Sequence, residues 1–244
     1  MDKAMDFLMR RLSAIGDLTE GDRQSLLTLP FKRRRMSRGE EIVTEGDEAT
    51  ACCLVITGYV HRSKVLATGK RQIFSLHMPG DIPDLHGLHL PRMDHNLVAT
   101  APAEVALFSH VAVQRLLDQS SRLTALFWRD TLIDAAAFRA WMLMLGQAEA
   151  PVRMAHLFCE LYVRSQLVGL NQENSFALPI SQIDLADMLG TSTVHANRTL
   201  QDLRLQGLVD FKRGRVTVLR WRELAELGMF DSSYLHIVEA APAQ

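Results

Sequence analysis

The pattern of apolar and polar positions divides the chain into a helical start, a β-rich segment and a second helical part. Residues 1–30 predict a helical lead-in. Residues 31–110 hold short apolar runs at close intervals, separated by turn signals such as Glu45-Gly46-Asp47 and Pro79-Gly80-Asp81. Strands at a spacing of roughly ten residues are typical of a β-barrel or a β-sandwich.

Residues 111–147 predict one long helix, because they contain no proline and no glycine before Gly146. One apolar stripe of this helix comprises Leu126, Ile133, Ala137, Ala140 and Met144. A second stripe, about 200° away at 100° per residue, comprises Trp128, Leu132, Ala135 and Met142. A helix that is apolar on two opposite faces must be covered on both. The β-rich segment can cover one face, and we expect a second copy of the same helix to cover the other in a two-fold dimer. The alternative is a helix buried entirely within one monomer.

Residues 178–209 are typical of two short helices joined by a tight turn. Ser181 precedes the first helix and has Asp184 three residues later, an approximate capping box. The apolar side of the first helix is expected to consist of Ile183, Leu185 and Leu189. Gly190 interrupts the helical pattern, and Ser192 can cap the second helix. The sequence therefore predicts a helix-turn-helix, although an ordinary helical hairpin in a core would give a similar pattern.

The second helix of this pair carries donors, acceptors and one cation on a single face, which is what a helix needs to read base edges in a major groove. The residues expected to contact DNA from it are Ser192, Thr193, Val194, His195, Asn197, Arg198 and Gln201. A β-hairpin signal follows directly, with a basic, glycine-containing turn. Its cations Lys212, Arg213 and Arg215 are suited to phosphate contact, which supports affinity and register. Helix pair and hairpin together predict a winged helix-turn-helix.

Composition supports a globular DNA-binding protein. The 244 residues are 48% apolar and 23% charged, with a net charge of −1. Between residues 176 and 222, however, seven Lys and Arg stand against four Asp, so the positive excess is local. The chain shows no secretory signal at its start and no run near the ~20 apolar residues of a membrane span, so we expect a cytoplasmic protein without a membrane partner. Cys52, Cys53 and Cys159 make no disulfide framework, and of the adjacent pair we expect one thiol buried and one exposed.

The chain resembles the Crp/Fnr family of bacterial transcription regulators along nearly its whole length. Residues 33–85, with Gly39, Gly46, Gly58 and the Pro79-Gly80-Asp81 turn, look like the opening of the family's barrel. Residues 150–161 (APVRMAHLFCEL) look like the start of its DNA-binding domain, and residues 190–198 (GTSTVHANR) fall where the family carries its helix-turn-helix. The resemblance implies a homodimer that binds a palindromic promoter site in double-stranded DNA and controls RNA polymerase there. It implies no enzymatic activity.

The expected fold class is α+β, with three parts in order along the chain. Residues 1–110 would form a sensor domain, a cyclic-nucleotide-binding-like β-barrel or jelly roll preceded by the N-terminal helix. Residues 111–148 would form the dimerisation helix, and residues 149–244 the winged helix-turn-helix domain.

The residues that would bind an effector depart from the family's nucleotide-binding members. Those members hold ribose with a Gly-Glu pair and the cyclic phosphate with an Arg-Ser or Arg-Thr pair. Here the first region reads Ile82-Pro83-Asp84-Leu85, and in the second Asp94 would repel a phosphate near Arg92. Cyclic nucleotide binding is therefore disfavoured, and we predict no cofactor and an effector of unknown identity, if any. The candidate effector residues are Asp84, Leu85, His86, His89, Arg92 and His95.

Metal sensing is the remaining alternative for this loop. Three cysteines, none before Cys52, exclude the family's four-cysteine iron–sulfur cluster. The spacing His86-Gly-Leu-His89 could ligate a metal or haem, with Asp84 or Asp94 completing the shell. Histidines in a polar loop are usually exposed or hydrogen-bonded, however, so no metal is predicted. Two rivals to a regulator stay open: a cupin-like metal enzyme, although the chain lacks the usual His-x-His, and a ligand-regulated protein-interaction module, against which the basic wing argues.

The helix expected to read DNA also departs from the family. Many members place a Glu at its second position and an Arg four residues later. Here Val194 stands where those members have the Glu, and Arg198 stands where they have the Arg. Valine can contact a thymine methyl but cannot accept a hydrogen bond from cytosine. We therefore expect a half-site unlike the common one, with Arg198 still reading guanine.

Overall fold

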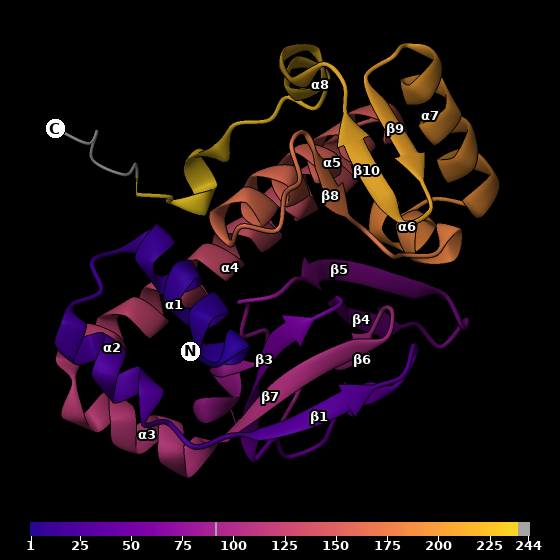
Figure 1. The fold of residues 1–244 in the computed structure, drawn as a ribbon. Coiled ribbons are helices and arrows are strands. Elements are labelled where there is room, and N and C mark those ends of the chain that lie inside the picture. Colours follow the sequence, from indigo (N-terminus) through magenta and orange to yellow (C-terminus); the bar gives the residue numbers. More distant parts are fainter. Residues whose placement is uncertain (91, 239–244) are drawn as a thin grey trace, which may run out of the picture.

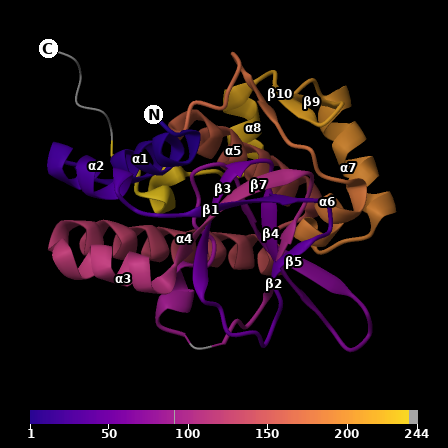
Figure 2. The ribbon, with the colours of Figure 1, turned by 60° about the horizontal axis from the view of Figure 1, so that its bottom comes forward.

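The N-terminal part of the chain folds into two antiparallel sheets that face each other (Figures 1 and 2). The computed structural model describes residues 1–90 and 92–238. One sheet has the order β1-β7-β3 and is built from β1 (Lys32–Met36), β7 (Ala103–Ser109) and β3 (Ala51–Thr57). The other has the order β2-β6-β4-β5 and is built from β2 (Glu41–Val43), β6 (Asn96–Ala99), β4 (Val60–Val65) and β5 (Arg71–His77). The predicted jelly roll is confirmed, as two facing sheets rather than one closed barrel.

Both faces of the β1-β7-β3 sheet are covered. Its inner face packs on the second sheet in a core made of Met36, Cys53, Val55, Val60, Leu97, Ala99, Ala103 and Val105. Its outer face packs on helices, with Cys52 and Phe108 in one buried cluster with residues of α1 (Lys3–Ile15) and α2 (Glu20–Leu27). Adjacent strand residues point to opposite faces, as expected. Both Cys52 and Cys53 are nevertheless buried, so the expectation that one thiol is exposed is wrong.

The single helix expected over residues 111–147 is two helices, α3 (His110–Gln119) and α4 (Ser121–Gln147). The break falls at Ser120, which has an extended backbone and accepts a hydrogen bond from the Leu123 amide, 3.2 Å away, at the start of α4. A serine side chain that caps the following helix competes with continuation of the preceding one, which explains the break. Leu126 and Ile133 of α4 are buried, whereas Trp128 on the opposite face is 63% exposed.

The C-terminal domain begins with α5 (Ala150–Leu167) and holds a small sheet of order β8-β10-β9 (Figure 1). Its strands are β8 (Ser175–Ala177), β9 (Val209–Lys212) and β10 (Arg215–Val218). Its remaining elements are α6 (Gln182–Leu189), α7 (Thr193–Leu205), α8 (Trp221–Leu227) and the 3-10 helix η2 (Ser232–Leu235). Its core is continuous with Ile73 and Leu76 of β5, so the two domains pack firmly together. The predicted end of this domain at residue 244 lies outside the described residues. No helix in the described ranges has the length and apolar character needed to cross a bilayer.

Candidate DNA-binding face and effector region

The first helix of the pair, α6, begins and ends as its sequence predicts. Ser181 Oγ accepts a hydrogen bond from the Asp184 amide at 3.0 Å, and the Asp184 carboxylate accepts from the Ser181 amide at 3.1 Å. Gly190 ends the helix with φ of 59°, a left-handed conformation that favours glycine. Leu185 and Leu189 are buried as expected, but Ile183 is 60% exposed. The apolar side of α6 is therefore narrower than predicted, because the core contacts only one edge of this short helix.

The second helix, α7, separates an inner apolar face from an outer polar one. Ser192 caps it by accepting from the His195 amide at 3.2 Å. The residues that face the core are Ala196, Thr199, Leu200 and Leu203. The predicted DNA-contacting residues Ser192, Val194, His195, Arg198 and Gln201 are exposed, and Thr193 and Asn197 are half-buried. Asn197 donates to Gln182 Oε1 on α6 at 2.7 Å, so it also holds the two helices together.

The hairpin between β9 and β10 forms the wing. Arg213 and Gly214 both have positive φ, 51° and 70°, as a two-residue hairpin turn of the primed type requires. Arg213 is exposed at the tip. Lys212 lies 2.8 Å from Asp210, and Arg215 donates to Ser175 Oγ at 3.1 Å. The three predicted wing cations therefore differ: two have partners within the domain, and Arg213 projects from the turn.

Comparison with known proteins assigns both halves of the chain. Residues 33–120 match the cyclic nucleotide-binding domain, and residues 152–227 match the Crp-like helix-turn-helix domain. The chain is 25% identical to the transcriptional activator protein FnrL of Cereibacter sphaeroides, over 86% of this chain and 87% of that protein. It is similar in structure to FixK2 of Bradyrhizobium japonicum, with a TM-score of 0.74 and 27% identity over 82% of this chain and 98% of that one.

The chain belongs to the Crp/Fnr family of transcription regulators. Another similar protein is the nitrogen fixation regulation protein FixK of Bradyrhizobium diazoefficiens, which is 27% identical over 77% of this chain and 78% of its own length. FnrL is a transcriptional activator, and FixK is a regulation protein of nitrogen fixation. The predicted family, fold class and regulatory function are thus confirmed.

The residues that the sequence marks as candidates for effector binding lie in and around the 3-10 helix η1 (Leu85–Leu88). A groove of about 170 Å³ separates η1 from α3 and α4, and its walls include Leu85, His86, His89 and Trp128. The structure thus brings three of the candidate effector residues to one groove. Arg92 does not join them, because its exposed side chain donates to the Gly46 carbonyl at 3.0 Å.

Asp84 also lies away from the groove, buried beneath the loop. Its Oδ1 accepts a hydrogen bond from the Cys53 amide at 2.7 Å, and Oδ2 has no partner among the described residues. Burial raises the pKa of Asp84 to about 7, although the Cys53 amide and the Arg62 charge oppose the shift. Asp84 therefore supports the strand β3 and is not a ligand-facing group.

These positions do not fit a cyclic nucleotide. Its phosphate would need a cation that faces the pocket, but Arg92 faces solvent. The buried Arg62 is already held by the Asp134 carboxylate at 2.6 Å and by the Pro83 carbonyl. The ribose of a cyclic nucleotide would need a carboxylate that accepts from two hydroxyls, but the Asp84 carboxylate already accepts from the Cys53 amide. The donor set expected for a cyclic nucleotide is therefore lacking in the described part of the sensor domain.

Three side chains of the same loop form what we call the histidine cluster: His86, Asp94 and His95. Each offers a possible ligand atom, and these atoms lie within 4.8 Å of one another. His95 Nδ1 is 2.7 Å from Asp94 Oδ1, and the two imidazole rings lie 5.3 Å apart. Both Nε2 atoms are buried without a hydrogen-bond partner among the described residues. Burial, assisted by the charge of Arg62, lowers the pKa of His86 to about 4 and also lowers the pKa of His95.

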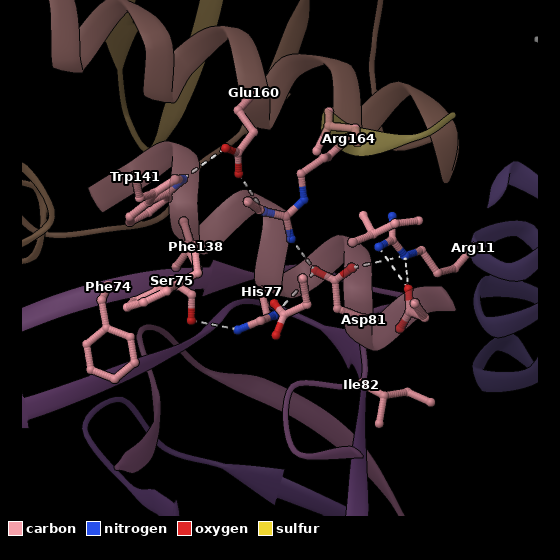
Figure 3. Close-up of a pocket in the computed structure, with 16 residues that line it drawn as sticks. Arg11, Phe74, Ser75, His77, Asp81, Ile82, Phe138, Trp141, Glu160 and Arg164 are labelled. Atoms are coloured by element: carbon pink, nitrogen blue, oxygen red, sulfur yellow. Dashed lines mark hydrogen bonds and ion pairs between the residues drawn. The ribbon is translucent and has the colours of Figure 1, made fainter. Parts of the chain in front are cut away.

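A second polar cluster lies where the two domains meet (Figure 3). This interdomain network consists of Arg11, Asp81, Asp130, Glu160 and Arg164. Arg11 Nη2 lies 2.8 Å from Asp130, and Arg164 lies 2.6 Å from Asp81 and 2.9 Å from Glu160. Burial opposes the charge of Arg164, but the two carboxylates outweigh it and raise the pKa of the guanidinium. Only about 30 Å³ of free space remains among these groups, roughly one water.

Sequence reasoning missed this network, although a signal for it exists in α1. Leu8, Arg11 and Ile15 follow steps of three and four residues on one face of the helix. A charged residue within an apolar stripe must find a buried partner, because an unpaired buried charge is too costly. Asp130 of α4 lies in the same way between Phe127 and Ile133, and it is the partner.

The helix-turn-helix is also tied directly to the sensor domain. Arg71 of β5 lies 2.6 Å from Asp184 and 2.7 Å from Asp187, both on α6. Gln72 donates to the Asp187 carbonyl at 2.6 Å, and Arg38 lies 3.1 Å from Asp184. The orientation of α6 and α7 is therefore set in part by the edge of the sensor sheet.

Proposed function

We propose that this regulator acts as a homodimer, binds a palindromic promoter site and controls RNA polymerase there. The observation that carries the proposal is the outer face of α7, where Arg198 and Val194 are exposed beside a wing with Arg213 at its tip. Such a face suits the major groove, while the wing suits the neighbouring phosphates. Because its target would be chromosomal DNA, we place its action in the cytoplasm.

The proposed dimer forms through α4. Leu126 and Ile133 of this helix are buried in the monomer, but Trp128, Leu132 and Met142 on the other face are exposed. Ala135, between them, is half-buried and small enough for close helix approach. An apolar face of this kind on a long helix supports a parallel contact with its copy. The two α7 helices of such a dimer would meet half-sites about one helical turn apart.

Within each half-site we assign different roles to the polar side chains. Arg198 reads a guanine edge, since a guanidinium can donate to both O6 and N7. Val194 contacts a thymine methyl. Arg213 contacts phosphate and gives affinity without sequence preference. What controls these contacts is, in this proposal, a small effector bound at the sensor domain.

Selection of duplexes from a random pool by the purified protein tests the proposal. We expect enrichment of a two-fold symmetric site with a guanine and a thymine at fixed places in each half. Arg198→Ala should weaken binding to that site by about 1–3 kcal/mol and relax one position per half-site. Arg213→Ala should instead weaken all sequences alike and reduce the salt dependence. An asymmetric site, or equal losses on all sequences for Arg198→Ala, would contradict the assignment.

A further inference from the structure

The histidine cluster combines features that polar loops rarely combine by chance. His95 is 4% exposed, yet its Nε2 has no partner among the described residues, and the same holds for His86 Nε2. Burying a polar nitrogen without a partner costs roughly 1–3 kcal/mol. Two such nitrogens beside one carboxylate therefore represent a cost that a bound group would remove. We propose that the Nε2 atoms of His86 and His95 bind a divalent transition-metal ion, with Asp94 orienting the ring of His95.

The donor set selects the class of ion. Two imidazoles suit Zn²⁺, Fe²⁺, Co²⁺ and related ions, whereas Mg²⁺ and Ca²⁺ prefer oxygen ligands only. The two rings already lie close together, with centroids 5.3 Å apart. Two protein ligands leave the remaining coordination positions open to water or to another small ligand.

Asp94 prepares the site. Its Oδ1 lies 2.7 Å from His95 Nδ1, so a neutral His95 carries its proton there and directs the lone pair of Nε2 inward. A carboxylate that holds a ring in this tautomer is a usual feature of metal-binding histidines. The Asp94 side chain is 76% exposed, so the site opens to solvent on this side. Its negative charge also compensates part of the charge of the ion.

One nearby charge opposes a cation. The guanidinium of Arg62 is close enough to lower the pKa of both histidines. That guanidinium is paired with Asp134 at 2.6 Å, however, and also donates to the Pro83 carbonyl. Its net repulsion is therefore small compared with that of a free cation.

The site touches α4 in two ways, and this gives a bound ion a route to the DNA-binding domain. His86 lines the groove that also contacts Trp128. His95 packs edge-on against Phe74 with ring centroids 5.8 Å apart, and Phe74 packs in the same way against Phe138 of α4. An ion that draws the two histidines together would thus change the packing on α4. This regulatory step rests on the proposed function, whereas the metal site itself does not.

Titration of the full-length, metal-stripped protein with Co²⁺ tests the site directly. We expect one ion per chain and a visible absorption spectrum typical of nitrogen and oxygen ligands. His86→Ala and His95→Ala should each weaken binding by more than about 100-fold, beyond the 10–100-fold loss typical of a supporting residue. His89→Ala is the matched control: this exposed histidine lies in the same loop but outside the cluster, and its loss should leave binding unchanged.

Each contrary result overturns the inference. Absence of saturable binding to a protein with native circular dichroism would mean that water alone satisfies the two imidazoles. An equal loss in His89→Ala and His86→Ala would mean that the ion sits on the His86-x-x-His89 pair. DNA affinity measured with and without one equivalent of Co²⁺ then separates the claims. Equal DNA affinity would overturn the regulatory step alone, and lack of DNA binding in both states would count against the proposed function.

Discussion

Two polar clusters, one within the sensor domain and one where the two domains meet, differ in how their buried polar atoms are satisfied. In the interdomain network, each charge meets an opposite charge: Arg11 pairs with Asp130, and Arg164 with Glu160. In the histidine cluster, two imidazole nitrogens meet nothing among the described residues. Both clusters border α4, and the two unpartnered nitrogens are as buried as the charges of the network.

The difference indicates different roles. A buried charge that has its partners holds elements in one arrangement, here α1, α4, α5 and the loop of Asp81. A buried nitrogen without a partner stabilises nothing and persists only where another demand outweighs its cost. We therefore regard the interdomain network as the structural joint of the molecule and the histidine cluster as its candidate sensing element.

The largest expected effect comes from removing one charge of the joint. Arg11→Ala should lower the free energy of unfolding by about 3–5 kcal/mol, because it leaves Asp130 buried without its cation. Arg10→Ala is the matched control on the same helix, since Arg10 is 51% exposed and its ion pair is with Asp6, one turn away on the same helix. It should cost less than about 1 kcal/mol. Urea unfolding at pH 7 measures the free energy of unfolding of both variants. Similar losses in the two would show that the buried pair of Arg11 and Asp130 does not stabilise the structural joint more than an exposed pair does.

How far the sequence predicts each region follows from how local its signals are. The caps at Ser181 and Ser192 and the end of the first helix at Gly190 follow from the sequence, because capping depends on residues within one turn. The wing followed from a basic, glycine-containing turn between two short strands. The sequence analysis does not predict the break at Ser120, although its cap is just as local, because no proline or glycine marks it.

The candidate effector region was predicted less well, since its geometry depends on long-range packing. Candidate residues close in sequence separate in space: Arg92 faces solvent, and Asp84 turns inward to the Cys53 amide. His86 and His95, nine positions apart, meet only because the loop folds back on itself. The burial of both Cys52 and Cys53 likewise depends on helices that cover the outer face of the sheet. Alternation along the strand cannot reveal such a cover.

Asp84 is a buried carboxyl without an ion pair among the described residues, so its titration should make the stability of the protein depend on pH. Its folded pKa, about 7, lies above its ordinary value of 3.8, so its contribution to stability is complete below pH 3.8 and is lost as the pH rises through 7. Asp84→Asn keeps the acceptor for the Cys53 amide and removes this titration. Relative to the unchanged protein, the variant should gain stability from pH 4 to pH 7, by at most about 1.4 kcal/mol per pH unit. Parallel stability curves over this range would show that Asp84 is ionised in the fold.

Arg71 forms ion pairs across the domains that are partly exposed, so its contribution to stability should be smaller than that of the buried network. Arg71→Ala removes contacts to Asp184 and Asp187, but Asp184 keeps its bonds to Ser181. We expect a loss of about 1 kcal/mol in the free energy of unfolding, which high salt reduces. Lys70→Ala, at the exposed neighbouring position, should change little. A loss as large as that of Arg11→Ala would place Arg71 within the structural joint.

The smallest expected effect has the opposite sign. His86→Leu should raise the unfolding free energy of the metal-free protein by about 0.5–1 kcal/mol, because it replaces an unpartnered nitrogen with an apolar group. The groove around it already holds Leu85 and Trp128, which suit a leucine neighbour. His89→Leu, at an exposed position, should leave stability within about 0.5 kcal/mol. Unfolding in the presence of a chelator measures both.

Whether His86→Leu raises or lowers the unfolding free energy decides whether the histidine cluster serves binding or, like the interdomain network, stability. Stabilisation by His86→Leu, together with loss of the stabilising effect of added Co²⁺, would mean that the histidine is retained for binding at the expense of the fold. Destabilisation by more than about 1 kcal/mol in the chelated protein would mean that His86 has a structural partner such as an ordered water. The histidine cluster would then be a second joint like that of Arg11, and the sensing element would have to be sought elsewhere along the groove beside α4.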